Sequence, residues 1–327
     1  MSYQTSYRMR HQLSDQLSDE TSAIRSAIRW RRFWVDREGE RMANQYKRSI
    51  GLALGSGSAR GLAHIGVLKV LEREGIPINA ISGASMGALI GGLYAAGMPL
   101  EEMEKIALSA TRRTVLTYLD PIPSLKGLIL GKRIEEMLRS FVGHRDLGDL
   151  DIPVAIVATD IRSGEEVVFK GTGDLVDAIR ASISVPVVFV PVQVEDRILV
   201  DGGVTNPVPV NVLASLDPKA VPVAVSVIPK VEHKQAQRPT TIDIFLNAFD
   251  IMQQRLYETN KSLARISIEP NVSFASGIEF WQAKRIIECG EEAALEALPE
   301  IKRALSPSSF LSILGKQLAA RFSTTLL

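Results

Sequence analysis

Cysteine is almost absent from this chain: Cys289 is the only one in 327 residues, so no intrachain disulfide can form. Histidine is scarce too, and its four copies lie far apart, without the spacing of a metal site. A charge excess of one sign is also missing, because 38 basic residues balance 37 acidic ones to a net charge of +1. Nucleic-acid binders usually carry a much larger basic excess. We therefore expect no disulfide scaffold, no metal and no nucleic-acid partner.

Long apolar runs are missing as well. No uninterrupted apolar stretch reaches the ~18 residues of a membrane-spanning helix. The first residues, MSYQTSYRMRHQLSDQLSDE, lack the apolar centre of a secretory signal. We expect a cytoplasmic protein, with peripheral contact to the inner face of the membrane as an option.

The two ends of the chain differ from its middle. Residues 1–47 are rich in arginine, and the segment TSAIRSAIRWRRFWV predicts an amphipathic helix with Ile24 and Ile28 on its apolar face. Such a helix suits a membrane interface, but it equally suits packing on its own domain or on a second subunit of an oligomer. Residues 306–327 form a second amphipathic segment with the same alternatives. These segments flank one expected domain over residues 48–305.

In this domain, short apolar strands alternate with helical patterns. The pattern predicts strands over residues 49–55, 78–82, 152–160, 197–200 and 221–228, and a hairpin arm over 165–173. It predicts helices over residues 60–74, 86–96, 174–182, 242–263 and 281–305. Strands that alternate with helices indicate a layered α/β domain with a largely parallel sheet.

The segment Gly83-Ala84-Ser85-Met86-Gly87 is a G-x-S-x-G pattern between a predicted strand and a predicted helix. A nucleophilic serine needs a tight strand-to-helix turn, where bulky neighbours two residues away would clash, so Gly83 and Gly87 fit such an elbow. The turn also places Ser85 at a helix N-terminus, whose N–H groups favour a developing oxyanion. An ordinary glycine-lined turn gives the same pattern, so the motif alone leaves both interpretations open.

A second glycine-rich loop, Gly55-Ser56-Gly57-Ser58-Ala59-Arg60-Gly61, also joins a predicted strand to a predicted helix. Its successive backbone N–H groups suit an anion. No Gly-Lys-Ser/Thr ending follows, which excludes a Walker loop, and the next strand lacks the acidic end of a dinucleotide site. The remaining interpretation is an oxyanion hole for acyl transfer.

A third motif, Asp201-Gly202-Gly203, ends the predicted strand RILV. An acid at a strand end suits an exposed turn beside the sheet edge where ligands bind, although a simple Asp-Gly turn looks the same. A serine nucleophile usually needs a histidine base, but no histidine has a catalytic context: His64 points toward the apolar face of its helix, and the others lie in polar segments.

In combination, these segments resemble the patatin-like phospholipase family, in its bacterial single-domain branch. The resemblance covers residues 48–230 and rests on LALGSGSARGLAHIGVLKVLEREGI, ISGASMGALIGGLYAAG, ATDIRSGEEVVF, AIRASISVPVVF and LVDGGVTNPVPV, in this order. It implies a three-layer α/β fold with a mainly parallel central sheet and helices on both faces. It also implies a Ser–Asp dyad without histidine, no metal cofactor, and a phospholipid, lysophospholipid or simpler fatty acyl ester as substrate.

Carried onto this sequence, the resemblance makes Ser85 the nucleophile and Asp201 the base, with an oxyanion hole built from Gly55, Gly57, Ser58 and Arg60. The family's loop is usually a run of glycines, and here Ser56 and Ser58 replace two of them. Backbone N–H groups survive this change, but a positive φ becomes harder to hold.

Two other functions remain as alternatives. The chain could be a binding or regulatory module that keeps the fold with little turnover. It could also transfer acyl groups to a carrier, although such enzymes need a histidine base and none is well placed here.

Overall fold

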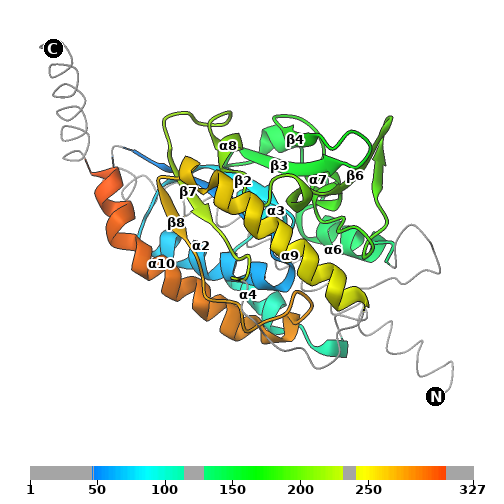
Figure 1. The fold of residues 1–327 in the computed structure, drawn as a ribbon. Coiled ribbons are helices and arrows are strands. Elements are labelled where there is room, and N and C mark those ends of the chain that lie inside the picture. Colours follow the sequence, from blue (N-terminus) through cyan, green and yellow to red (C-terminus); the bar gives the residue numbers. More distant parts are fainter. Residues whose placement is uncertain (1–45, 47, 114–128, 231–240, 307–327) are drawn as a thin grey trace, which may run out of the picture.

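A computed structural model describes residue 46 and residues 48–113, 129–230 and 241–306 (Figure 1). The two predicted amphipathic end segments lie outside these residues, apart from the boundary residues 46 and 306. Within the described ranges, no helix combines the length and apolar character needed to cross a membrane.

The centre of the fold is one mixed sheet. In the described ranges it has eight strands. Seven follow the order β5-β6-β3-β2-β1-β7-β8, and β4 pairs with β3 outside this order. Neighbours run parallel from β3 through β2, β1 and β7 to β8, whereas β4 and β6 pair antiparallel with β3, and β5 with β6. The strands are β1 (Ile50–Leu54), β2 (Ile78–Ala84), β3 (Val154–Asp160), β4 (Glu166–Lys170), β5 (Val192–Val194), β6 (Arg197–Asp201), β7 (Val221–Val225) and β8 (Ile266–Ile268).

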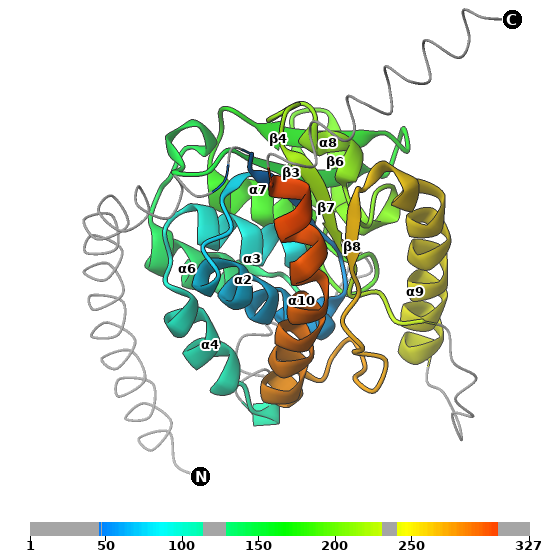
Figure 2. The same cartoon turned by 90° about the vertical axis from the view of Figure 1, so that its left-hand side faces the viewer.

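Helices cover both faces of this sheet (Figures 1 and 2). They are α2 (Ala63–Arg73), α3 (Met86–Ala95), α4 (Leu100–Leu108), α6 (Lys132–Val142), α7 (Leu175–Ser182), α8 (Val210–Leu213), α9 (Thr241–Asn260) and α10 (Ala283–Leu305). Short 3₁₀ turns include η1 (Ser58–Leu62) and η3 (Gly202–Val204). The predicted three-layer α/β class, with a mainly parallel sheet, is therefore confirmed.

Residue size distinguishes the two faces of the sheet. Large side chains such as Leu52 and Leu54 of β1 enter the main core, which α2, α3, α7 and α10 cover. Small alanines alternate with them, and Ala53 of β1 packs in a separate cluster with Val210 of α8 and Tyr257 of α9. Successive side chains of a strand point to opposite faces of the sheet, so alternating large and small residues leave room for a thick helical layer on one face and a thin one on the other.

Helices α2 and α10 pack backbone to backbone in the thick layer (Figure 2). A Cβ atom on Gly66 would overlap Ile287 O, and one on Gly290 would overlap Ala63 O. This crossing fixes the position of α2, and α2 directly follows the loop at the end of β1.

The predicted helices and strands are observed with small shifts in their bounds. The predicted helix 60–74 divides into η1 and α2, and the hairpin arm is β4. The sequence did not predict α4, α6, the short helix α8 or the three-residue strands β5 and β8, and a strand of three residues is too short to display alternation. The strand order reverses at β1, because the chain continues from β1 to β2 on one side and returns to the other side of β1 only with β7. Such a reversal opens a crevice at the carboxyl ends of the strands.

Candidate functional site

Ser85 occupies the sharp turn between β2 and α3. Its φ of 54° and ψ of −121° lie outside the ordinary regions for a residue with a side chain, and the residue is 4% exposed. Glycines make the turn possible, because a Cβ on Gly87 would overlap Leu54 O and one on Gly83 would lie 2.6 Å from Ala88 N. The turn therefore has the strained geometry that a nucleophile elbow requires.

Sheet register brings Asp201 to the level of Ser85. Ala84, the last residue of β2, pairs with Val157 of β3, and Ala158 of β3 pairs with Asp201 of β6. Strand β4 occupies the other edge of β3 over Ala155–Thr159, so β2 and β6 lie one after the other along the same edge, and the ends that carry Ser85 and Asp201 meet there. The structure corrects one expectation: Asp201 is 0% exposed rather than on an exposed turn, because Gly202 packs directly against Val157 O.

Burial raises the pKa of the Asp201 carboxyl to about 7, while a hydrogen bond with the Ser85 side chain and one with the Gly203 N–H oppose the rise. The Gly203 N–H donates to Asp201 Oδ1 at 2.7 Å. Within the described part of the chain, the buried Oδ2 has no hydrogen-bond partner, which leaves it able to accept a proton. Catalytic hydrogen bonds are often long before substrate binds and tighten afterwards.

The C-terminal end of α7 supports both residues. The Ser85 N–H donates to Ser182 Oγ at 2.9 Å, and Ser182 Oγ donates to Val157 O at 2.6 Å. Two residues later, Ser184 O accepts from the Asp201 N–H at 2.9 Å. Sequence reasoning missed these two serines, although both lie in the segment AIRASISVPVVF that carried part of the resemblance.

The Gly-rich loop follows β1 and continues into η1. The Gly55 N–H donates to Val225 O at 2.9 Å and the Arg60 N–H to Gly57 O at 3.1 Å, so both are already engaged. Among the described residues, the N–H groups of Gly57 and Ser58 have no acceptor. Ser58 has a φ of 50°, the positive value that its side chain disfavours. Two adjacent free donors on a strained turn suit an anion.

His64 lies beneath this loop on α2. Its Nε2 is 2.8 Å from Gly55 O, and because a carbonyl can only accept, Nε2 carries the proton. The ring is 0% exposed, and burial lowers the pKa of His64 to about 4, with the Gly55 contact opposing the change. His64 is therefore a neutral, packed histidine whose donor is already engaged.

His144, the other histidine of the described residues, lies away from this site. His144 is exposed and lies 3.2 Å from Asp174 Oδ2, while His11 and His233 lie outside the described residues. In the described ranges, no group of three or more His, Cys, Asp or Glu side chains could hold a metal ion.

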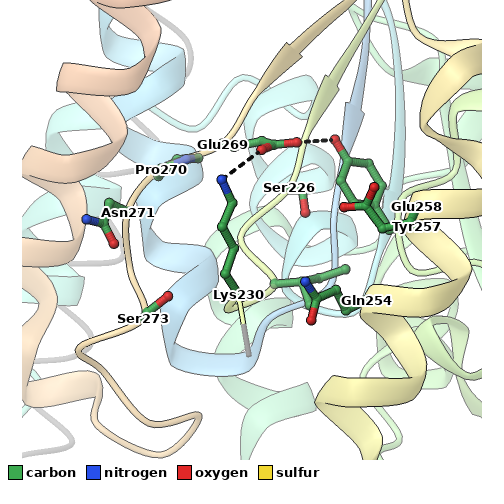
Figure 3. A pocket seen from close by; sticks show the side chains of 10 residues that line it. Ser226, Lys230, Gln254, Tyr257, Glu258, Glu269, Pro270, Asn271 and Ser273 are labelled. Atoms are coloured by element: carbon green, nitrogen blue, oxygen red, sulfur yellow. Dashed lines mark hydrogen bonds and ion pairs between the residues drawn. The ribbon is translucent and has the colours of Figure 1, made fainter. Parts of the chain in front are cut away.

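A cavity of about 260 Å³ lies beside the C-terminal half of α9 (Figure 3). Glu269 forms part of its wall, where it accepts from the Tyr257 hydroxyl at 3.0 Å and pairs with Lys230 at 3.5 Å. The wall around Ser226 follows β7, on the side of β1 away from β2. The Gly-rich loop therefore lies between this cavity and Ser85, and the cavity is separate from the candidate site.

Part of this chain is similar in sequence to known proteins. The family model "Patatin-like phospholipase" matches residues 52–214. An uncharacterised NTE family protein of Mycobacterium tuberculosis is 45% identical over 168 residues, which are 51% of this chain and 46% of that protein. Neuropathy target esterase sws of Drosophila melanogaster is 31% identical over 173 residues, 51% of this chain and 12% of that protein. The chain spans less than half the length of either relative.

Among solved structures, VipD from Legionella pneumophila aligns with a TM-score of 0.48 and 14% identity, over 77% of this chain and 67% of that one. The matched residues 52–214 include the Gly-rich loop, Ser85 and Asp201. The chain belongs to the patatin-like phospholipase family.

Proposed function

We propose that this protein hydrolyses fatty acyl esters, as a phospholipase, lysophospholipase or carboxylesterase, with Ser85 as nucleophile and Asp201 as base. One observation carries the proposal: Ser85 sits on a strained elbow and contacts a fully buried carboxyl whose pKa is raised to about 7. An ordinary aspartate, with a pKa of about 3.9, would be too weak a base for a hydroxyl. The raised pKa brings Asp201 close to the neutral range in which a general base works best.

In the proposed reaction, Asp201 takes the Ser85 proton while Oγ attacks the ester carbonyl. The carbonyl oxygen becomes an oxyanion, which the free N–H groups of Gly57 and Ser58 would stabilise. The tetrahedral intermediate expels the alcohol, which leaves with the proton from Asp201, and an acyl-enzyme remains. Asp201 then deprotonates a water molecule, whose attack releases the fatty acid and restores Ser85.

The engaged N–H groups of Gly55 and Arg60 refine the sequence-based proposal for the oxyanion hole. We infer that these two residues support the loop, while Gly57 and Ser58 supply the donors. The Gly83 and Gly87 positions keep the elbow tight. We also infer that residues 48–305 form the catalytic domain.

The test is hydrolysis of a short p-nitrophenyl ester by wild type, Ser85→Ala and Asp201→Asn. Ser215→Ala and Asp217→Asn are matched controls near the end of α8, outside the candidate site. We expect both site variants to lose activity while folded and both controls to keep it. A folded Ser85→Ala or Asp201→Asn variant with wild-type activity would refute the assignment. A wild type that neither hydrolyses ester nor reacts with a fluorophosphonate would favour a non-catalytic binding module.

A further inference from the structure

Helix α9 packs against the Gly-rich loop and the Asp201 turn from the outside. Gln253 and Tyr257 on its inner face are 2% and 4% exposed, whereas Ile244 and Met252 on its outer face are each 56% exposed. Figure 1 shows α9 crossing in front of the carboxyl ends of the strands. Polar side chains on the buried face of a helix need hydrogen-bond partners, because water cannot reach them.

The first partner is Arg60, in the Gly-rich loop. Its Nη2 donates to Asp250 Oδ1 at 2.6 Å, and the two side chains are 5% and 18% exposed. Charged groups as buried as these are expensive to separate, because removing one leaves the other without a counter-charge. Arg60 follows Ser58 by two residues, so this ion pair fixes the end of the strained turn.

The second partner is Ser56, at the beginning of the loop. Gln253 Nε2 donates to Ser56 Oγ at 3.0 Å, and both residues are almost completely buried. Gly203 lies at the same point: a Cβ there would overlap Gln253 Nε2 and would lie 2.9 Å from Asp201 Oδ1. Gln253 therefore contacts the Gly-rich loop and the turn that holds the Asp201 carboxyl.

We propose that Asp250 and Gln253 are positioning residues: through Arg60 and Ser56 they hold the Gly-rich loop in the conformation that binds the oxyanion. This inference rests on the proposed function. Ser58 keeps a positive φ that a serine disfavours, so the loop needs external restraints to hold it. The two contacts with α9 restrain the loop on either side of the free N–H groups of Gly57 and Ser58.

The experiment compares Asp250→Asn and Gln253→Met with the wild type. Gln254→Met is the matched control for the second substitution, because it makes the same change at the next residue of α9. Glu258→Gln, an exposed acid on α9, is the control for the first. Asp250→Glu tests rescue, since it keeps the carboxylate on the helix. Amide hydrogen exchange of residues 52–62 reports loop order, and kcat and KM on a p-nitrophenyl ester report its effect on the reaction.

We expect Asp250→Asn and Gln253→Met to speed amide exchange in residues 52–62 and to lower kcat about 10- to 100-fold. Complete loss of one oxyanion donor costs about 10²- to 10³-fold, and a displaced loop loses part of this. KM should change less than about twofold, because the oxyanion forms only in the transition state. Asp250→Glu should recover part of kcat, and both controls should match the wild type.

Unchanged exchange in the loop of either variant would overturn that restraint, whatever the activity. Faster exchange with kcat unchanged would overturn the positioning role and leave a purely structural contact. A variant with a lower Tm but a wild-type kcat, counted per serine that reacts with a fluorophosphonate, would also overturn the positioning role. If the wild type itself has no turnover and Ser85 does not react with a fluorophosphonate, the proposed function fails, and the catalytic role of these residues fails with it. Exchange would still show whether α9 restrains the loop.

Discussion

Ser182 Oγ accepts a hydrogen bond from the Ser85 N–H at 2.9 Å, across 97 residues of sequence, and donates one to Val157 O at 2.6 Å. One hydroxyl thus ties the elbow to β3, the strand that pairs along one edge with both β2 and β6. We expect Ser182→Ala to reduce kcat by at least about tenfold and the free energy of unfolding by about 1–3 kcal/mol, because two buried polar groups lose their partner. Ester kinetics and urea unfolding measure these effects, with the exposed Ser215→Ala as control. Wild-type kcat in a folded Ser182→Ala variant would rule out this support.

Asp201 should destabilise the fold at the pH at which it works. Its pKa rises from 3.8 unfolded to about 7 folded, so between these values the folded state binds more protons and stability falls as pH rises. Asp201→Asn should therefore raise the free energy of unfolding at about pH 8 by up to roughly 4 kcal/mol while abolishing activity. The gain should vanish near pH 4. Urea unfolding across this pH range tests the prediction. An inactive Asp201→Asn variant with the same free energy of unfolding as the wild type at about pH 8 would contradict it.

His64 gives the opposite pH dependence. Its pKa falls from 6.5 unfolded to about 4 folded, so as pH drops through this window the unfolded state binds the proton first and stability is lost. The loss should reach about 3 kcal/mol at pH 4 and be absent above pH 6.5. His64→Gln keeps a donor for Gly55 O and should remove this part of the acid sensitivity without a large loss of activity. His64→Leu should lower stability at neutral pH by about 1–3 kcal/mol, because Gly55 O loses its partner. An unchanged acid profile in His64→Gln would contradict the assignment.

The crossing of α2 and α10 should not tolerate a methyl group. Gly290→Ala places a Cβ on Ala63 O, and Gly66→Ala places one on Ile287 O. We expect each to lower the free energy of unfolding by about 1–3 kcal/mol, despite the better helix propensity of alanine. Gly51→Ala is the control, since its Cβ meets neighbours at 3.4 Å, an ordinary contact distance. Equal stability of all three variants in urea would mean that the helices can separate freely.

Local patterns were enough to predict much of the fold. The strand runs and the G-x-S-x-G turn depend on neighbouring residues, so their bounds were predicted to within a few residues. Asp201 was different, because an Asp-Gly pair is common: its motif fitted a ligand site and a simple turn equally, and only the resemblance favoured a catalytic role. It reaches Ser85 through the register of β6 on β3, and antiparallel pairing of this kind leaves no mark on the local sequence.

The supporting residues were the hardest to predict. Asp250 and Gln253 lie on a long helix whose polar residues would normally face water. Arg60 and Asp250 are 190 residues apart, and no local period connects them. His64 was expected to pack toward the apolar face of its helix, and its burial confirms this, but its contact with Gly55 O depends on how the loop folds back.

The pH dependence of Ser85 phosphonylation by a fluorophosphonate shows which group takes the Ser85 proton. Phosphonylation needs the serine proton removed but no turnover of substrate. We expect the rate constant to rise with pH through a midpoint near 7, the pKa of Asp201, and we expect Asp201→Asn to lose both the reaction and this midpoint. A folded Asp201→Asn protein that reacts at the wild-type rate with the same midpoint would show that another group activates Ser85.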